Sequence, residues 1–280
     1  MPKPPKARLG IIAGGGALPV RLAEAAAIAG RDPYIVVLGG AGRETDFDAW
    51  PHVTIDVAAV GRILAALRLA GCAELVLAGT LQRPRFTDLR PDWRGLMLLP
   101  RVVAAARHGD DALLQTLVGF LEQEGFRVVG ADQVLNDLLA PEGVLGLVRP
   151  GDADMADLAR AGQVLLALGT LDVGQAVVVR DGQVLGIEAA EGTDRLIERC
   201  AGLQPAGRGG VLLKLSKTGQ ERRVDLPTIG TRTIELAAAA RLAGIGIEAG
   251  AALILDRDKV AAAADAAGLF VVGLPRPKAN

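Results

Sequence analysis

Aromatic residues, histidine and cysteine are scarce in this 280-residue sequence. Aromatic residues make up 3% of it and only two residues are histidine, although hydrophobic residues make up 50%. The small and aliphatic residues Ala, Leu, Val and Gly must therefore supply most of the core packing. A dinuclear phosphoesterase centre built from His and Asp ligands is hard to assemble from two histidines, so that class of enzyme is disfavoured.

The two cysteines, Cys72 and Cys200, lie far apart and match no metal-binding or redox spacing. They are typical of buried thiols in a reducing compartment. Neither belongs to an activating motif and the sequence contains no G-x-S-x-G. Nucleophilic catalysis by Cys or Ser is therefore disfavoured as well.

Long hydrophobic runs and an excess of charge are also missing. No segment approaches the roughly 18 consecutive apolar residues that span a bilayer, and no signal-peptide core follows the basic, Pro-rich start. The formal net charge of -1 argues against nucleic acid as a partner. We therefore expect a cytoplasmic protein that is soluble or at most peripheral on a membrane.

The first part of the sequence alternates between short apolar strands and helical patterns. Segments with the length and β-branched composition of buried strands lie at 9–13, 34–38, 53–56, 74–79 and 126–130. This alternation predicts an α/β fold that begins with a Rossmann-like domain, built on a parallel sheet and spanning residues 1–132.

Residues 133–280 predict a second domain of mixed α/β structure. A helix is expected over residues 154–168. Asp181-Gly182 then stands between two apolar runs, which is the sequence signature of a tight β-hairpin. The second domain should therefore contain at least one antiparallel strand pair.

The loop Ala13-Gly14-Gly15-Gly16 ends the first expected strand and leads into the first expected helix. Glycines let a ligand approach the backbone, and a helix N-terminus offers N–H groups to an anion. Pro19 stands where a dinucleotide-binding G-x-G-x-x-G motif would have its third glycine. The loop therefore favours a nucleotide or phosphate ligand over a dinucleotide cofactor, with a plain tight turn as the alternative.

Polar residues follow or precede several other expected elements. Thr80 and Gln82 follow a later strand at the carboxyl edge of the sheet, where ligands of open α/β sheets bind, although a plain turn is the simpler interpretation. His108-Gly109-Asp110-Asp111 resembles a metal motif, yet paired acids before a helix are what N-capping and the helix dipole favour.

In the second domain, Glu188, Glu191 and Asp194 place three acids within seven residues, together with Gly192 and the hydroxyl of Thr193. A ligand or metal role and a simple helix cap explain this group about equally well.

The stretch 211–235 gathers Lys214, Lys217, Arg222 and Arg223 around one acid, Asp225. Arg and Lys suit phosphate oxygens, and nearby cations favour the charged form of a carboxylate. An ionised Asp beside a bound phosphate suits Mg²⁺ binding or the orientation of an attacking water. The alternative is a solvated charged hairpin in which Asp225 serves the following turn.

Residues 93–103, WRGLMLLPRVV, combine a Trp and a Met with several Leu and flanking Arg residues. This composition suits an apolar groove or a membrane-facing patch, but core packing is the favoured interpretation unless the substrate is a lipid.

Five motifs follow one another between Gly10 and Gly250: GIIAGGGALP, HGDDALL, DVGQAVVVRDGQVLGIEAAEGTD, KLSKTGQERRVDLPTIGTRTIE and AGIGIEAG. Together they resemble the LpxI-type UDP-2,3-diacylglucosamine pyrophosphatases of lipid A biosynthesis. The glycine loop alone would be unspecific, whereas the ordered motifs of the second domain are specific.

The resemblance implies a two-domain hydrolase that needs a divalent metal, usually Mg²⁺, and binds its ligand between the domains. It implies hydrolysis of UDP-2,3-diacylglucosamine to 2,3-diacylglucosamine 1-phosphate (lipid X) and UMP, with water attacking the α-phosphorus. In the family the acid of the R-x-D-L-P-T motif is essential, and here this acid is Asp225.

From the local patterns and the resemblance we predict Asp225, Lys214 and Arg223 as catalytic residues, with Asp225 also the candidate metal ligand. The expected substrate-binding residues are Ala13, Gly14, Gly15, Gly16, Thr80, Gln82, Gln133, Glu188, Gly192, Thr193, Asp194, Lys217 and Arg222. The expected partners are a lipid-linked nucleotide sugar, the inner-membrane surface in transient contact and, by base rate, a second copy in a symmetric homodimer.

Two other functions fit the same pattern. A transferase that uses a UDP-sugar would also suit two α/β domains, and a non-enzymatic sensor of nucleotides or lipids would bind without turnover.

Overall fold

The computed structural model describes residues 8–81, 89–135 and 138–277. The chain forms two compact units, one of residues 1–136 with 221–225 and the other of residues 137–220 with 226–280. Residues 221–225 thus belong to the first unit, although the segments on both sides of them belong to the second.

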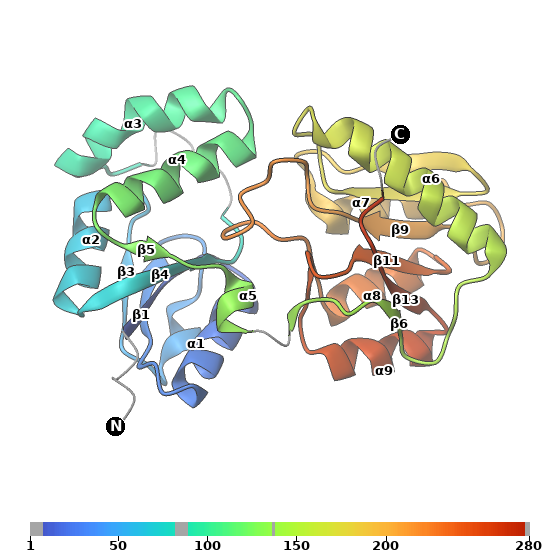
Figure 1. Ribbon diagram of the computed structural model, residues 1–280, viewed down its shortest axis with the longest axis horizontal. Coiled ribbons are helices and arrows are strands. Elements are labelled where there is room, and N and C mark those ends of the chain that lie inside the picture. The colour runs from blue at the N-terminus through green and yellow to red at the C-terminus, as the bar shows by residue number, and fades with distance from the viewer. Residues whose placement is uncertain (1–7, 82–88, 136–137, 278–280) are drawn as a thin grey trace. The chain divides into compact units, whose positions relative to one another are not determined.

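The first unit is a parallel sheet with helices on both faces (Figure 1). Its strand order is β3-β2-β1-β4-β5 and every pair is parallel. The strands are β1 (Arg8–Ala13), β2 (Tyr34–Leu38), β3 (His52–Ile55), β4 (Cys72–Ala78) and β5 (Arg127–Val128). This order confirms the predicted Rossmann-like sheet and places the carboxyl ends of β1 and β4 side by side, at the point where such sheets bind ligands.

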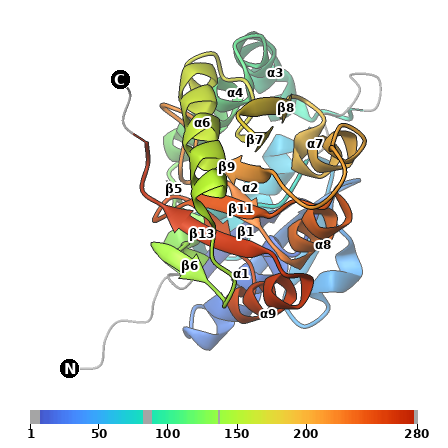
Figure 2. The same ribbon diagram turned by 90° about the vertical axis from the view of Figure 1, so that its right-hand side faces the viewer.

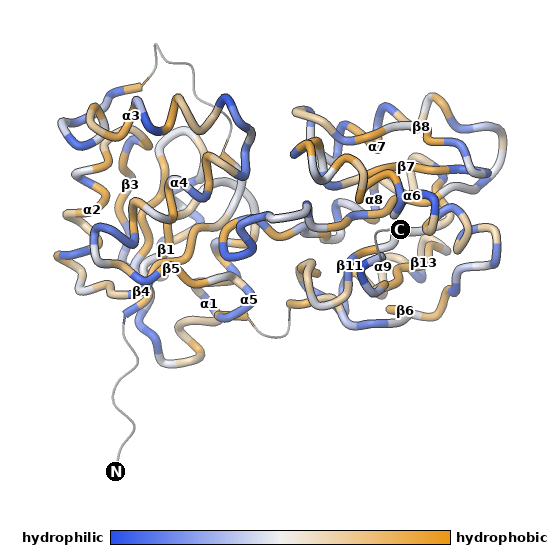
Figure 3. The backbone as a smooth tube through the Cα atoms, turned by 45° about the horizontal axis from the view of Figure 1, so that its top comes forward, coloured by the Kyte–Doolittle hydropathy of each residue, from blue (hydrophilic) through white to orange (hydrophobic). Residues whose placement is uncertain are grey.

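The helices of this unit cover the sheet in two sets, with α1 and α5 on one side and α2 and α4 on the other (Figure 1). They are α1 (Leu18–Ile28), the 3₁₀ helix η1 (Glu44–Phe47), α2 (Val60–Leu69), α3 (Trp93–Ala106), α4 (Asp110–Gln123) and α5 (Ala131–Val134). The strands between them are drawn mainly in the hydrophobic colour (Figure 3). The side chains of the inner strands β1 and β2 are mostly buried because helices cover both faces of the sheet.

Helix α3 contradicts the core-packing interpretation of residues 93–103. Gly95 and Leu98 form its buried side, whereas Trp93, Leu96 and Met97 are exposed. A Cβ atom on Gly95 would lie 2.1 Å from the carbonyl oxygen of Ala58, so the helix backbone rests directly on the segment before α2. Because Gly95 and Leu98 must face inward, the side chains on the opposite side of the helix face outward.

The second unit is built on a mixed six-stranded sheet in the order β6-β13-β11-β9-β7-β8. Strands β9, β11 and β13 are parallel, and antiparallel pairing adds β6 at one edge and β7 with β8 at the other. The strands are β6 (Gly143–Leu145), β7 (Ala176–Arg180), β8 (Gln183–Ile187), β9 (Val211–Lys214), β11 (Gly244–Glu248) and β13 (Phe270–Leu274), and a separate parallel pair is β10 (Thr228–Ile229) with β12 (Leu253–Ile254).

Helix α6 covers one face of this sheet, and α7, α8 and α9 cover the other (Figure 2). Alternating strand residues supply the two cores: Val177 and Val211 pack with α6, whereas Val178 and Leu212 pack on the opposite side. The helices are α6 (Asp152–Gly169), α7 (Gly192–Ala201), α8 (Thr231–Ala239) and α9 (Arg257–Ala267). The prediction of a mixed α/β second domain is therefore confirmed.

The predicted hairpin joins β7 to β8, and its turn residues Asp181 and Gly182 have φ angles of 51° and 76°. The buried carboxylate of Asp157, on α6, accepts the N–H groups of Asp181 at 2.9 Å and of Gly182 at 2.7 Å. One side chain therefore satisfies both turn amides and ties the hairpin to the helix.

We predict that Asp157→Ala lowers the free energy of unfolding of the second unit by about 1–3 kcal/mol, because two partly buried turn amides lose their charged acceptor. Urea unfolding followed by far-UV circular dichroism measures this loss. Asp152→Ala, an exposed acid on the same helix, is the matched control and should cost less. Equal losses in the two variants would contradict the role assigned to Asp157.

Candidate functional site

The glycine loop lies at the carboxyl edge of the first sheet and is paired with the loop after β4. Gly15 and Thr80 exchange two backbone hydrogen bonds of 2.8 Å. Ala13 is the last residue of β1 and is fully buried. Since β1 and β4 are parallel neighbours, the predicted residues Ala13, Gly14–Gly16 and Thr80 are brought together at one edge.

Close backbone packing explains two of the glycines. A Cβ atom on Gly14 would lie 2.6 Å from the carbonyl oxygen of Thr80, and one on Gly15 would lie 2.7 Å from that of Ala41. The N–H groups of Gly14 and Gly15 donate to the carbonyl oxygens of Ala78 and Thr80. The next amides, of Gly16 and Ala17, have no hydrogen-bond partner among the described residues. These are the loop amides that an anion at the start of α1 would meet.

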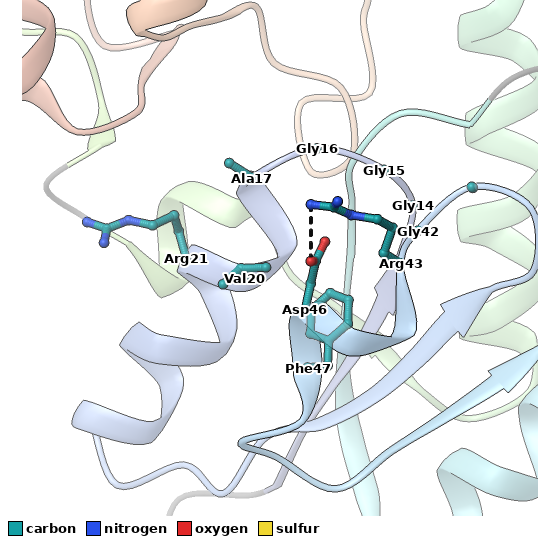
Figure 4. Close-up of a pocket in the computed structure, with 11 residues that line it drawn as sticks. Gly14, Gly15, Gly16, Ala17, Val20, Arg21, Gly42, Arg43, Asp46 and Phe47 are labelled. Atoms are coloured by element: carbon teal, nitrogen blue, oxygen red, sulfur yellow. Dashed lines mark ion pairs between the residues drawn. The ribbon is translucent and has the colours of Figure 1, made fainter.

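A pocket of about 510 Å³ opens beside this loop (Figure 4). One wall is the loop with the first turns of α1, and the other is the segment from β2 into η1, where Arg43 and Asp46 form an ion pair of 3.4 Å. The lining residues are Gly14, Gly15, Gly16, Ala17, Val20, Arg21, Ala41, Gly42, Arg43, Asp46 and Phe47. Backbone amides and arginine side chains give the pocket donors for a polar or anionic ligand group.

The sequence prediction included the glycine wall of this pocket but missed Arg43, Asp46 and Phe47. These residues belong to no motif, and they approach the loop only because β2 is the sheet neighbour of β1. Of the other residues predicted in the first unit, Gln133 is exposed on α5. Gln82 lies outside the described residues.

The segment that carries Asp225 is anchored to α4 of the first unit. The N–H group of Glu221 donates to the Asp111 carboxylate at 2.7 Å, and Val224 packs against the core beneath α4. The N–H groups of Val224 and Asp225 both donate to the carbonyl oxygen of Glu221 at 3.1 Å, which closes a tight turn. Asp225 is half-buried at the end of this turn.

Arg223 fastens the same turn from its other side. Its guanidinium binds the Glu221 carboxylate through Nε at 2.8 Å and Nη2 at 2.7 Å, and binds Glu122 of α4 through Nη1 at 2.6 Å. These hydrogen bonds from Arg223 hold the pKa of Glu221 below its usual range, against the opposing effect of burial. The Arg223 side chain was predicted to contact phosphate, but in the structure it binds the carboxylates of Glu221 and Glu122.

From their position before a helix, Asp110 and Asp111 are expected to act as capping residues rather than as metal ligands. Both do lie in the first turn of α4. In addition, the carboxylate of Asp111 accepts the Glu221 amide from 110 residues further along the chain. The sequence shows the HGDD motif, but it does not show that the Glu221 amide is the hydrogen-bond partner of Asp111.

In the second unit, Lys214, Thr193 and Glu188 form a chain of hydrogen bonds. The Lys214 ammonium donates to Thr193 Oγ1 at 2.9 Å and to the carbonyl oxygen of Thr228 at 3.1 Å. The Thr193 hydroxyl donates to Glu188 Oε1 at 2.7 Å, and the Gln175 amide donates to Glu188 Oε2. Lys214 and Glu188 are both buried. Three predicted site residues are thus brought together by the end of β9, the end of β8 and the start of α7.

The remaining residues predicted in this unit have separate surroundings. The Lys217 ammonium pairs with Asp172 at 2.5 Å. Gly192 begins α7 with a φ of 80°, and Asp194 lies 4.0 Å from Arg232. The catalytic role of Lys214 and the binding role of Lys217 stay predictions, as does the binding role of Arg222, which belongs with Asp225 to the first unit.

A second buried polar cluster, at the carboxyl ends of β9, β11 and β13, was missed. The N–H and hydroxyl groups of Ser216 donate to Glu248 Oε2 at 2.8 and 2.7 Å, and Arg276 binds both residues. Glu248 lies in the AGIGIEAG motif at the end of β11. An acid at the end of an apolar strand, within a family motif, was the sequence feature that could have predicted this cluster. Parallel strands bring these residues to the edge that also holds Lys214.

Within the described part of the chain, no three His, Cys, Asp or Glu side chains gather into a group that could hold a metal ion. Mg²⁺ in proteins is often held by one or two carboxylates together with water and substrate phosphates. Separately, no helix in the described residues combines the length and apolarity needed to cross a membrane.

The two sheets and their polar edges define a class of two-unit α/β protein with a phosphate-compatible glycine loop in one unit and a buried cation and acid network in the other. The sequence matches the LpxI N-terminal domain over residues 8–138 and the LpxI C-terminal domain over residues 141–272. It is 47% identical over 273 residues to UDP-2,3-diacylglucosamine pyrophosphatase LpxI of Caulobacter vibrioides, covering 95% of this chain and 97% of that protein. The chain belongs to the LpxI family, as the motifs predicted.

The contacts of Glu221 predict a pH dependence for the first unit. Because the pKa of Glu221 is lowered in the folded protein, its ion pair stabilises the fold above the pKa of the unfolded chain. That stabilisation is lost as the pH falls through the lowered folded pKa. Glu221→Gln should therefore cost about 1 kcal/mol near neutral pH and progressively less in acid.

Urea unfolding followed by tryptophan fluorescence measures this effect in the first unit, because both tryptophans, Trp50 and Trp93, lie there. Glu24→Gln, which removes a more exposed pair with Arg21, is the control and should change stability less. A cost of Glu221→Gln that is independent of pH would contradict the assignment.

Proposed function

We propose that this protein hydrolyses the diphosphate bond of UDP-2,3-diacylglucosamine to 2,3-diacylglucosamine 1-phosphate and UMP, with water attacking the α-phosphorus. The observation that carries the proposal is the likeness to the Caulobacter vibrioides pyrophosphatase, which extends through nearly the whole of both chains. The two domain matches add that both halves of the family's architecture are present.

We assign the catalytic acid as Asp225, and the rigidity of its surroundings supports this choice. The turn 221–225 is held by the Asp111 carboxylate, by the ion pairs of Arg223 and by the packing of Val224. A catalytic side chain must be held close to its productive geometry, and supporting contacts of this kind supply that restraint. A freely moving loop would lose much of the benefit of proximity.

Asp225 has two compatible roles. As a general base it would accept a proton from the attacking water, and as a ligand it would help to hold Mg²⁺ against the diphosphate. Bound Mg²⁺ would supply positive charge to the phosphate oxygens. The absence of a three-ligand cluster in the described residues fits a metal held largely by substrate and water.

Arg223 is better suited to a positioning role than to phosphate binding. Its fork is already bound by Glu221 and Glu122, and a guanidinium engaged by two carboxylates has little capacity left for a third anion. We infer that it contributes to catalysis by keeping the turn that carries Asp225 in place.

We predict that Asp225→Asn lowers kcat by about 10²- to 10⁴-fold, because the amide can neither accept the proton nor provide a charged ligand. Steady-state release of UMP measures the loss, and thermal unfolding should show an unchanged fold. Asp258→Asn, an exposed acid at the start of α9, is the control and should retain wild-type kcat. Near wild-type turnover in Asp225→Asn would remove Asp225 from the mechanism.

Hydrolysis in ¹⁸O-labelled water tests the reaction itself, with Mg²⁺ and with EDTA in parallel. Attack of water on the α-phosphorus places one heavy oxygen in UMP, which mass spectrometry detects, and EDTA should abolish the product. Label in the lipid phosphate would show attack on the other phosphorus. Unlabelled products formed only with an added acceptor would identify a transferase, and binding without product would identify a sensor.

We also propose that the protein works at the surface of the inner membrane. A substrate with two acyl chains resides in a bilayer, so a hydrolase without a membrane-crossing helix among its described elements must reach it from the surface.

A further inference from the structure

Among the described helices, α3 carries the largest group of exposed large apolar side chains. Three large side chains, Trp93, Leu96 and Met97, project from its first turns, and Trp93 and Met97 are 75% and 65% exposed. Leu96 is half exposed. Trp93 and Met97 are four residues apart and lie one above the other on the helix, with Leu96 beside them. Pro100 and Ala104 continue the same side and are exposed as well.

The orientation of this surface is fixed by packing. Helix α3 lies outside α4, on the side away from the sheet (Figure 1). Leu98 is buried, and Gly95 touches the backbone of Ala58 so closely that the helix cannot rotate without a clash. Asp92 caps the helix by accepting the Gly95 amide at 2.9 Å. The exposure of Trp93, Leu96 and Met97 therefore follows from a well-packed helix.

The surface is bordered by positive charge. Arg90, Arg94, Arg101 and Arg107 lie within or beside α3, whereas Asp92 is the one acid between Arg90 and Arg107. Arg94 pairs with Glu124, and among the described residues Arg101 makes a long contact of 3.5 Å with Gln123. Arg90 and Arg107 are exposed. Apolar side chains, including a Trp, flanked by arginines are the composition of helices that lie in the interface of an anionic bilayer.

We infer that the α3 face, defined as Trp93, Leu96, Met97 and Pro100 with the flanking arginines 90, 94, 101 and 107, docks on the surface of an anionic lipid bilayer. The inference deepens the proposed function, since it names the surface through which the enzyme would reach a diacylated substrate. The apolar side chains enter the boundary between headgroups and acyl chains, and the arginines contact lipid phosphates.

Charge complementarity decides for a bilayer over a second copy of this chain. A twofold contact through the α3 face would bring the same four arginines of two copies together, and like charges across an interface are unfavourable. Anionic headgroups meet these arginines with the opposite charge, and each basic residue near such a surface adds attraction.

The test uses the full-length protein and vesicles that contain no substrate. Flotation measures binding to phosphatidylcholine vesicles with or without about 30% phosphatidylglycerol. We expect binding to the anionic vesicles, and a loss of about tenfold or more in the partition coefficient for Leu96→Ser/Met97→Ser. Arg101→Ala/Arg107→Ala should remove most of the preference for anionic lipid.

The control is Ile28→Ser/Leu69→Ser, which removes two apolar side chains of the same unit that are 89% and 92% exposed on other helices. It should bind vesicles like the wild type. In a Trp50→Phe background, the fluorescence of Trp93 reports insertion directly. It should shift to shorter wavelength on binding and be quenched by brominated acyl chains.

Absent binding to anionic vesicles, an equal loss in the control variant, or Trp93 fluorescence unaffected by brominated lipid would overturn the inference. So would light scattering that shows a wild-type dimer and a monomeric Leu96→Ser/Met97→Ser variant, since the α3 face would then contact a second copy. Thermal unfolding checks that each variant is folded.

Release of UMP from detergent-solubilised substrate separates this inference from the proposed function. Vesicle binding without UMP release refutes the function and leaves the docking surface in place. UMP release without vesicle binding supports the proposed function and refutes the docking surface.

Discussion

The hydrogen bond from the Glu221 amide to the Asp111 carboxylate is the contact on which the candidate catalytic segment depends. It joins two positions that are 110 residues apart and fixes the turn 221–225 at the start of α4. Arg223 adds a second attachment to the same helix, at Glu122. Both attachments use charged groups, which form stronger hydrogen bonds than neutral groups do. Losing either one would leave Asp225 on a longer, looser segment.

This anchoring also bears on how the chain is divided between its units. Residues 221–225 belong to the first unit, although the strands before and after them, β9 and β10, belong to the second. The chain on both sides of Asp225 therefore leads into the second unit, whereas Asp225 itself packs with the first unit.

In the second unit, the polar residues at the carboxyl edge of the sheet are buried and held by side-chain hydrogen bonds. Lys214 and Glu248 end adjacent parallel strands, and both are buried. Each is surrounded by specific hydrogen-bonding partners: the Thr193 hydroxyl for Lys214, and Ser216 with Arg276 for Glu248. Buried polar groups are tolerated when they are satisfied in this way, and such networks favour one arrangement over competing ones. The edge is therefore preorganised by the protein itself.

The sequence predicted the features that depend on local pattern. The apolar runs of β1 and β2, the turn at Asp181-Gly182 and the joining of the glycine loop to a helix follow from residue type and spacing alone. The motifs predicted the family because they occur in order along both domains.

The features that the sequence could not predict depend on distant contacts. Asp111 looked like a helix cap because its partner amide lies far along the chain. Arg223 looked available for phosphate because its acids lie partly on α4. Trp93 and Met97 looked like core residues because their composition is that of a core, whereas the close approach of Gly95 to Ala58 turns them outward. Spacing in a sequence does not report which side of a helix is covered.

Helix α4 links these observations within the first unit. It packs against α3 on its outer side, and its own residues Asp111 and Glu122 hold the turn of Asp225. A rigid helix between the α3 face and the acid fixes the separation between the two. If α3 lies on a bilayer, the height of Asp225 above the lipid surface is then set by the packing of one helix. On the proposed mechanism, the acyl chains of the substrate stay in the bilayer while its diphosphate reaches Asp225, which requires a constant distance between the two. An α3 that could tilt freely on α4 would not meet this demand, and the contact between Gly95 and Ala58 is what restrains it.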